Sequence, residues 1–400
     1  MKKVLQLLQK SKDSRTRTML TESPQNDYDG THQKNGLSQS LSKITLVKKG
    51  IALLLTGFLC VSLTSCAQNA NRISQLEPVT PNGSGIFSLA PKGQQPPKAV
   101  QEQMGPHTAC ALNLQEKYLG VPYESISKTQ NLDIYIPQGK GPFPVIVDIH
   151  GGAFMVGSSN DIYEIQVVDE GIAHGYAVVS INYRMSGEAR FPRAVNDVKA
   201  AVRFVRANAQ KYHFNPDKIV AWGGSAGGNL VAMLGTTGNV NTLNGDDTEN
   251  LNYSSNVQAV VDWFGPCNFL KYDEQFKLEG IHPLFGSVFK SNSPETLYIG
   301  QDLRKDPQFT EKANPETYIN TMNPKNAPYF FIQHGTADQN IPYQQSIDLA
   351  NDLITKIGTK KVRLGLLLGA HHGDPMFSTP QNFQKVFNFL DRIFDYSYSY

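Results

Sequence analysis

The sequence predicts an α/β protein with a mostly parallel central sheet flanked by helices. From about Tyr118 to the C-terminus, short Val/Ile/Leu-rich runs alternate with longer amphipathic stretches. Most of the short runs are continuously apolar, which is typical of strands buried on both faces. Alternation of such strands with helices favours parallel strands joined by helical crossovers. A composition of 40% hydrophobic and 18% charged residues agrees with a globular chain.

The apolar runs and amphipathic stretches define the expected elements in chain order. Strands are expected at residues 132–136, 145–149, 176–183, 219–222, 257–263, 329–333 and 362–368. The clearest helices are expected at residues 191–212, 343–357 and 381–394. The early strands precede the first clear helix, so an antiparallel arrangement at one edge of the sheet is possible.

Residues 268–327 interrupt this alternation. They are polar and aromatic with scattered prolines, and they separate two of the expected core strands. We therefore expect a small insertion that covers the strand ends. Together these observations predict one α/β domain over residues 107–400.

The charge of the chain is distributed unevenly. Residues 1–66 contain 10 Lys and Arg against 4 Asp and Glu, whereas residues 67–400 contain 27 against 31. The body of the protein is thus slightly acidic and lacks the excess of Lys and Arg that is typical of nucleic-acid-binding proteins. The positive charge belongs to the N-terminal segment.

The N-terminal segment has the features of an export signal. Lys48 and Lys49 precede an uncharged stretch at 51–63, which as a helix would rise about 20 Å and is too short to span a membrane. It is followed by Leu63 and Cys66 in a pattern similar to a bacterial lipobox. This predicts cleavage before Cys66, lipidation of that residue and contact with a membrane of the cell envelope. The alternative is an ordinary secretory signal with a chance cysteine, giving a soluble exported protein.

Two features of this segment leave alternatives open. About 45 mostly polar residues precede the apolar stretch, so the start of translation could instead be Met19. Residues 67–106 are rich in Asn, Gln, Gly and Pro and are expected to form a flexible tether. Removal of Cys60 and modification of Cys66 would leave Cys110 and Cys267, which either pair in an oxidising compartment or stay free.

A nucleophile motif follows the strand at 219–222. The sequence from Gly223 to Gly227 reads G-G-S-A-G and opens an apolar helix, which is the strand–turn–helix context of G-x-S-x-G. The flanking glycines allow a sharp turn that exposes the Ser225 hydroxyl, and the helix N-terminus favours negative charge there. A phosphate-binding turn is the alternative, but the Lys-Ser/Thr ending of a phosphate loop is absent.

A second loop is expected to stabilise an oxyanion. The strand at 145–149 ends in His150, Gly151 and Gly152, whose glycine N–H groups can point at a developing oxyanion together with the N–H of Ala226. His150 begins the loop, and we expect it to hold the loop backbone rather than to react.

The acid and the base are expected beyond two later strands. Asp338 lies in the loop after the strand at 329–333, and His371 and His372 follow the strand at 362–368. A serine needs a base to remove its proton, and an acid to orient that base. We favour His372 over His371, because neighbouring side chains in a loop diverge and only one faces the serine. A metal cluster of these histidines with Asp374 is disfavoured, because no zinc spacing accompanies them.

These motifs together resemble the α/β-hydrolase esterases related to bifunctional feruloyl and acetyl-xylan esterases and to the hormone-sensitive-lipase-type carboxylesterases. The resemblance covers about Tyr118 to the C-terminus and is carried by residues 150–154, 180–184, 186–189, 191–192, 222–228, 260–266, 334–338 and 369–374. It implies the α/β-hydrolase fold, with Ser225 as nucleophile and Asp338 and His372 as its partners. The sequence departs from the family at His371, where a small residue is usual.

The resemblance also implies the supporting residues. Gly151, Gly152 and Ala226 would be the oxyanion donors, and Arg184 with Asp197 would form a structural pair behind the site. No metal or organic cofactor is implied.

We interpret the chain as a serine hydrolase of carboxylic esters, such as short acyl or carbohydrate-linked acetyl or feruloyl esters. Phe154, Trp263 and Phe264 are candidates for the walls of the substrate pockets, although aromatic residues are more often core. The alternatives are an amidase or peptidase with the same triad, and a non-catalytic surface-binding lipoprotein. The expected partners are a small-molecule or carbohydrate ester and, through Cys66, a membrane.

Overall fold

The computed structural model describes residues 114–245 and 249–395. The predicted signal region, the lipidation site at Cys66, the tether and Cys110 lie outside these residues. Within the described ranges, no helix has both the length and the apolar character needed to cross a bilayer.

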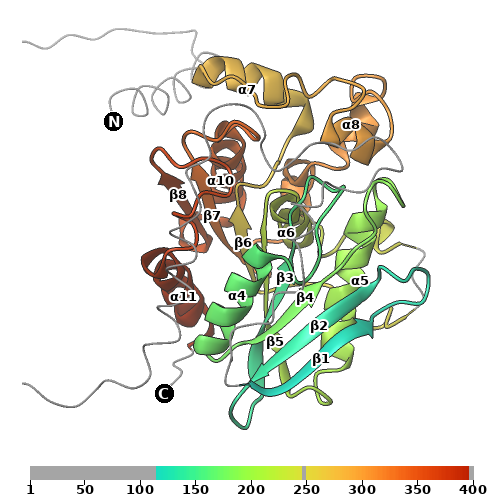
Figure 1. Ribbon diagram of the computed structural model, residues 1–400, viewed down its shortest axis with the longest axis vertical. Helices are drawn as coiled ribbons and strands as arrows, with labels where there is room; N and C mark the ends of the chain where they lie inside the picture. The colour runs from blue at the N-terminus through green and yellow to red at the C-terminus, as the bar shows by residue number, and fades with distance from the viewer. Residues whose placement is uncertain (1–113, 246–248, 396–400) are drawn as a thin grey trace, which may run out of the picture. The chain divides into compact units, whose positions relative to one another are not determined.

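The described residues form one eight-stranded sheet with the order β1-β2-β4-β3-β5-β6-β7-β8 (Figure 1). The strands are β1 (Leu114–Pro122), β2 (Asn131–Pro137), β3 (Phe143–Ile149), β4 (Ala177–Ile181), β5 (Phe214–Gly224), β6 (Ala259–Trp263), β7 (Tyr329–Gly335) and β8 (Val362–Leu367). All pairs from β4 to β8 are parallel, whereas β1 pairs with β2 and β2 with β4 in antiparallel fashion. The predicted fold class and the antiparallel edge are both confirmed.

Helices cover both faces of this sheet. They are α4 (Ile162–Ala173), α5 (Arg193–Ala207), α6 (Ala226–Thr236), α10 (Gln344–Ile357) and α11 (Pro380–Phe394), with single turns η1 (Asn241–Leu243) and η4 (Thr359–Lys361). Side chains of α4 and α11 pack with Val220 and Trp222 in one core. Side chains of α5, α6 and α10 pack with Ile219 and Ala221 in the other. Alternate residues of β5 therefore enter opposite cores, as the two-residue period of a strand requires.

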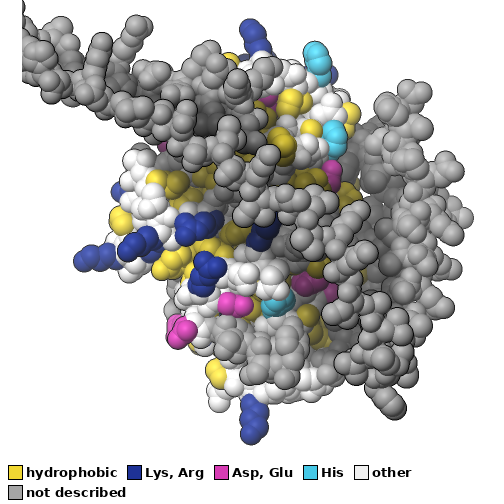
Figure 2. Space-filling model, turned by 90° about the vertical axis from the view of Figure 1, so that its left-hand side faces the viewer, with side chains coloured by type: hydrophobic (Ala, Val, Ile, Leu, Met, Phe, Trp, Pro, Cys, Tyr) yellow, Lys and Arg dark blue, Asp and Glu magenta, His cyan; other side chains and the backbone are white. Residues whose placement is uncertain are grey.

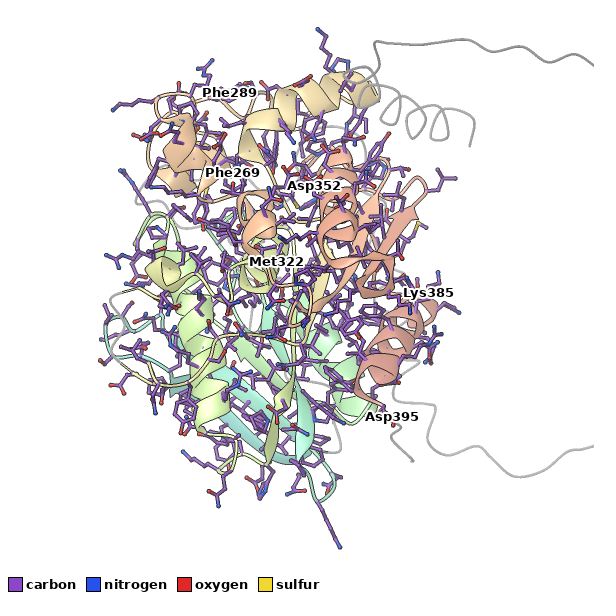
Figure 3. The ribbon with its side chains drawn as sticks, turned by 180° about the vertical axis from the view of Figure 1, so that it is seen from behind. Phe269, Phe289, Met322, Asp352, Lys385 and Asp395 are labelled. Carbon is purple, nitrogen blue, oxygen red and sulfur yellow. The ribbon has the colours of Figure 1, made fainter. Side chains whose placement is uncertain are left out.

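The connection between β6 and β7 contains several short helices. They are η2 (Phe269–Lys271), α7 (Tyr272–Glu279), α8 (Pro294–Ile299), α9 (Pro307–Glu311) and η3 (Pro315–Thr321). The N–H of Leu284 donates to the carbonyl of Gln339, which lies just past the carboxyl end of β7. This part of the chain therefore reaches the end of the sheet from which the catalytic loops project. Figure 3 shows Phe269 and Phe289 in this region, away from Lys385 on α11.

Buried polar groups hold the base of this connection. The side-chain oxygen of Gln345 accepts hydrogen bonds from the N–H groups of Cys267 and Asn268, at 2.7 and 2.6 Å. The side-chain oxygen of Asn314 accepts from the N–H of Phe269 at 3.1 Å. Because these amides are buried, each needs such an acceptor. The two ends of the segment 269–313 are therefore held next to each other.

The sheet has two edge strands of different character. β1 alternates half-buried and exposed residues and contains two register irregularities. β8 presents Leu364 and, just past its end, Leu368 to solvent, with exposed fractions of 37% and 75%. Figure 2 shows the face that lies on the left of Figure 1, where apolar side chains lie close to Lys and Arg side chains.

Candidate active site

Ser225 stands at the turn between β5 and α6. Its backbone has φ 57° and ψ −122°, a conformation that residues with a Cβ rarely adopt. Such strain costs on the order of 1–3 kcal/mol and is held in place by its surroundings. The N–H of Ser225 donates to the carbonyl of Trp263 at 2.9 Å, which fixes the turn to β6.

The glycines of the motif allow the close approach of two backbones. A Cβ on Gly227 would lie 2.0 Å from the carbonyl oxygen of Ile149, and a Cβ on Gly223 would lie 2.7 Å from the same oxygen. Larger residues would therefore push β3 away from the turn. Gly151 also lies against the serine, since its Cβ would stand 3.4 Å from that of Ser225.

The structure brings the three predicted triad residues together from three strand ends. Nε2 of His372 lies 2.9 Å from Oγ of Ser225, and Nδ1 of His372 lies 2.7 Å from Oδ2 of Asp338. The Asp338 side chain is fully buried and that of His372 is 15% exposed. His371 is exposed, and its N–H donates to Asp374. His372, and not His371, therefore contacts the serine.

Asp338 is held as a carboxylate. Its Oδ1 accepts from the N–H groups of Asn340 and Ile341, and its Oδ2 lies 3.3 Å from Nε2 of His334. Burial alone would raise the pKa of Asp338, but the charge and hydrogen bonds of His372 and His334 hold it well below the usual range. The charged acid can therefore orient and stabilise a protonated His372.

His334 is a contributor that the sequence reasoning did not assign. It is fully buried at the end of β7, and its Nδ1 lies 2.7 Å from the hydroxyl of Ser346. Its Nε2 is also 3.1 Å from the carbonyl of Ile341. The sequence feature that could have identified His334 is its position at a strand end, four residues before Asp338. A tight loop between the two residues brings the acid back to the imidazole.

His150 holds the oxyanion loop, as expected. It is fully buried and stacks on Tyr183, with ring centroids 4.3 Å apart. Its Nδ1 lies 2.7 Å from the carbonyl of Gly151, and the Tyr183 hydroxyl donates to the carbonyl of His150. Burial lowers the pKa of His150 to about 4, so the ring is neutral at physiological pH.

The amides of this loop are not equivalent. The backbone of Gly151 hydrogen-bonds to the buried carboxyl group of Glu164 and so favours the ionised form. Burial and the charges of nearby aspartates nevertheless raise the pKa of Glu164. The Gly151 backbone is therefore directed at this carboxyl group. Ala226 is the first residue of α6, so its N–H has no acceptor within that helix. The oxyanion-donor roles of Gly151, Gly152 and Ala226 stay predictions.

The aromatic residues predicted to wall the pockets differ in position. Phe154 is 2% exposed and stacks on Tyr298 at 3.9 Å, and Trp263 is 6% exposed and packs on Trp222. Both are core residues, which corrects the expectation that they line a pocket. The ring centroids of Phe264 and His372 are 4.7 Å apart, so the phenyl ring packs against the imidazole.

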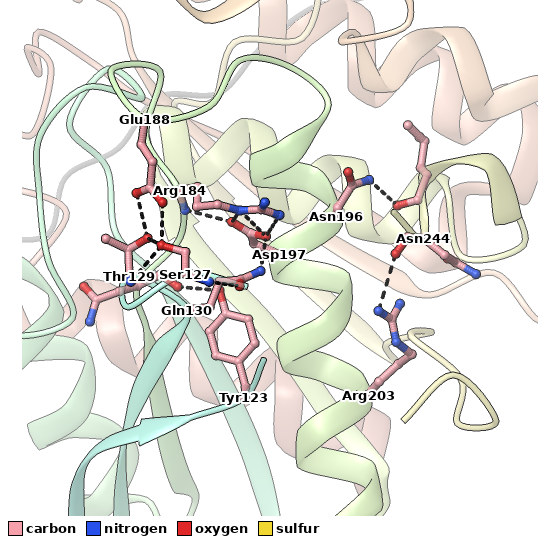
Figure 4. A network of polar contacts seen from close by, with 12 residues as sticks. Tyr123, Ser127, Thr129, Gln130, Arg184, Glu188, Asn196, Asp197, Arg203 and Asn244 are labelled. Carbon is pink, nitrogen blue, oxygen red and sulfur yellow. Dashed lines mark hydrogen bonds and ion pairs between the residues drawn. The ribbon is translucent and has the colours of Figure 1, made fainter. Parts of the chain in front are cut away.

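Arg184 and Asp197 form the expected buried pair (Figure 4). Nη2 of Arg184 lies 2.5 Å from Oδ1 of Asp197, and Gln130 donates to the same oxygen at 2.8 Å. The neighbouring Ser186 donates from both its N–H and its hydroxyl to the carbonyl of Phe154, at 2.8 and 2.9 Å. The pair therefore anchors the segment that supports the oxyanion loop.

Cys267 is buried, and burial raises the pKa of its thiol. Its possible partner Cys110 lies outside the described residues, so pairing stays a prediction. In the part of the chain that the structure describes, no three or more His, Cys, Asp or Glu side chains are grouped so as to hold a metal ion.

Comparisons with known proteins agree with this geometry. The BD-FAE family matches residues 132–353, more than half of the chain. Esterase LipC of Mycobacterium tuberculosis is 30% identical over 58% of this chain and 53% of its own length. The chain spans about half the length of LipC and of the probable carboxylic ester hydrolase LipM.

Solved structures show the same fold. A truncated carbohydrate esterase from gut microbiota superposes with a TM-score of 0.64 at 29% identity, covering 72% of this chain and 99% of that one. A bifunctional GH43-CE protein of Bacteroides eggerthii gives 0.60 at 32% identity, over 69% of this chain and 35% of that one. The chain belongs to the BD-FAE family, and its described residues have the fold of these esterase structures.

Proposed function

We propose that the protein hydrolyses carboxylic esters through an acyl-enzyme on Ser225. One observation carries the proposal: the hydrogen-bonded series from the serine hydroxyl through His372 to Asp338, with separations of 2.9 and 2.7 Å. These are hydrogen-bond distances for a nucleophile, its base and the acid that orients the base.

The geometry supports a two-step reaction. Oγ of Ser225 attacks the ester carbonyl while Nε2 of His372 takes its proton, and the resulting oxyanion accepts from the N–H groups of Gly152 and Ala226. The tetrahedral intermediate then expels the alcohol, which receives the proton from His372. A water molecule, deprotonated by the same imidazole, attacks the acyl-enzyme and releases the carboxylic acid and the free serine.

We further propose short acyl esters of carbohydrates as the substrate class. The gut-microbiota structure is that of a truncated carbohydrate esterase, and this chain covers 99% of its length. The motif resemblance to feruloyl and acetyl-xylan esterases points to the same chemistry.

The test is a panel of acetylated sugars, feruloyl esters and simple short-chain esters, measured with the wild type and Ser225→Ala. The wild type is expected to hydrolyse esters and to be labelled by an organophosphonate, and Ser225→Ala to do neither. Matched amides provide the control for leaving-group preference. Faster turnover of the amide, or activity that persists in Ser225→Ala, would overturn the proposal.

Export and lipid anchoring through Cys66 are also proposed, on the sequence alone. In a bacterial host, the full chain is expected to incorporate a labelled fatty acid and to fractionate with membranes. The Cys66→Ser variant is expected to lose the label. A wild-type protein that takes up no label would contradict the lipobox interpretation.

A further inference from the structure

We propose that Tyr163 is a specificity-determining residue on the alcohol side of the site, and that it favours esters whose alcohol is a sugar ring. The inference rests on the proposed ester hydrolysis and assigns the part of the substrate that Tyr163 contacts.

Tyr163 lies beside the loop that carries the catalytic imidazole. Its hydroxyl is 3.8 Å from the point at which a Cβ of Gly373 would stand, and Gly373 follows His372 directly. Tyr163 belongs to the first turn of α4, and the next residue of that helix, Glu164, hydrogen-bonds to Gly151 of the oxyanion loop. The phenol therefore stands where the segment that follows the oxyanion loop meets the histidine loop.

The direction of proton transfer identifies this side of the site. The alcohol oxygen must lie near Nε2 of His372, because it receives its proton from that atom as it leaves. The carbonyl oxygen instead points toward the amides of Gly152 and Ala226. Side chains at the outer border of the histidine loop are therefore next to the alcohol and not next to the acyl group.

The exposed surface at this border suits a sugar. Tyr163 is 56% exposed and Met376, on the histidine loop, is 43% exposed. Exposed aromatic and thioether groups offer flat or adaptable apolar surface, on which the C–H face of a sugar ring can pack. Partial burial and the charges of Glu164 and Asp374 raise the pKa of the Tyr163 phenol, so its O–H stays available as a donor to a sugar hydroxyl.

Hydrogen bonds within the histidine loop hold its shape. Asp374 accepts hydrogen bonds from the N–H groups of His371 and Met376, at 3.2 and 3.0 Å. The N–H of Phe377 in turn donates to the carbonyl of Asp374. A surface fixed in this way loses little conformational entropy on binding, which favours selection of a rigid ring.

The test compares two acetate esters that differ only in the alcohol, an acetylated methyl xyloside and ethyl acetate. In Tyr163→Ala, kcat/KM for the xyloside is expected to fall about tenfold, mainly through KM, with less than about a twofold change for ethyl acetate. Tyr163→Phe keeps the ring and is expected to retain most of the preference.

Tyr253→Ala is the matched control, because Tyr253 is also exposed, at 39%, and precedes the amino end of β6, opposite the catalytic end. It is expected to leave both esters unaffected. Labelling of Ser225 by an organophosphonate checks that each variant is folded.

The outcomes separate the two proposals. An equal loss on both esters, no loss on either, or a wild type that hydrolyses ethyl acetate but not the xyloside would overturn the role of Tyr163 and leave ester hydrolysis intact. A wild type that hydrolyses no ester in the panel would instead overturn the proposed function, and this inference with it.

Discussion

The ends of two neighbouring strands bury aspartates whose pKa values are shifted in opposite directions. At the end of β6, Asp262 is fully buried and its Oδ1 accepts from the N–H of Gly265 at 2.9 Å. Its Oδ2 has no hydrogen-bond partner among the described residues, and burial raises its pKa to about 7. At the end of β7, Asp338 is equally buried, yet its pKa lies below the usual range.

The difference lies in the partners and not in the burial. Two imidazoles face Asp338 and stabilise its charge, whereas Asp262 receives one backbone N–H. Burial disfavours the charged form of any carboxyl group, so only a site with cationic or donor partners keeps it ionised. An ionised, oriented carboxylate is what a catalytic histidine requires, and the β7 end alone provides it.

The largest expected effect concerns the imidazole of His372, which lies between Ser225 and Asp338. His372→Ala should reduce kcat by up to about a millionfold, because the serine loses its base. His371→Ala should keep most of the activity, since its exposed side chain does not contact Ser225. Steady-state kinetics on one ester measures both, and a comparable loss in the two variants would contradict the assignment.

The next effect compares the two aspartates directly. Asp338→Asn should reduce kcat by roughly ten-thousandfold, because the amide cannot stabilise the imidazolium. Asp262→Asn replaces a carboxyl group by an amide of nearly the same shape in the same way, and should lower kcat only by a small factor. A large loss in Asp262→Asn with an intact fold would mean that the β6 end also takes part in the chemistry.

A smaller effect is expected from His334, which acts through Asp338. His334→Gln should lower kcat by about tenfold, corresponding to about 1.4 kcal/mol, because Asp338 loses one stabilising partner. KM should change little, since His334 is fully buried and does not face the substrate. A change confined to KM would show that His334 does not act through the triad.

The smallest effect is on stability. Between about pH 4 and pH 7 the folded protein holds a proton on Asp262 that the unfolded chain has released, so this group lowers the free energy of unfolding as pH rises. Asp262→Asn should remove up to about 1.4 kcal/mol per pH unit of that decline. Urea unfolding from about pH 4.5 to 6.5 measures the slope.

Asp338→Asn is the control for this measurement. Its folded pKa is depressed, so its contribution is complete above the unfolded pKa of about 4 and is lost only at lower pH. The slope between about pH 4.5 and 6.5 should therefore be unchanged. Equal slopes in the wild type and Asp262→Asn would show that Asp262 is already ionised in the folded state.

Local sequence patterns predicted most of the sheet and the triad. The continuous apolar runs predicted β2 to β7, because both faces of these strands are covered by helices. The run at β8 is apolar as well, although that strand lies at an exposed edge. Ser225, Asp338 and His372 each lie in the loop after a predicted strand. This position was sufficient to predict that they converge, since the carboxyl ends of parallel strands share one edge.

The features that were missed depend on partners distant in the chain. β1 is an irregular edge strand with polar residues, and nothing in its own pattern distinguishes it from a loop. The contact of Glu164 with Gly151 joins α4 to the oxyanion loop, and no spacing rule predicts it. Phe154 was predicted as a candidate pocket wall, but Tyr298 of the β6–β7 connection stacks on it.

The closure of residues 269–313 at Phe269 and Asn314 makes this segment an exchangeable cassette. Lengthening a closed loop is inexpensive, about 0.6 kcal/mol for each doubling, and the strands are already joined beneath it. Family members can thus diversify this cassette, and engineers can transplant it, without rebuilding the catalytic centre. A replacement must cover the Phe154 ring beside the oxyanion loop as Tyr298 does, and must supply the core contacts of Phe269, Tyr272 and Phe276.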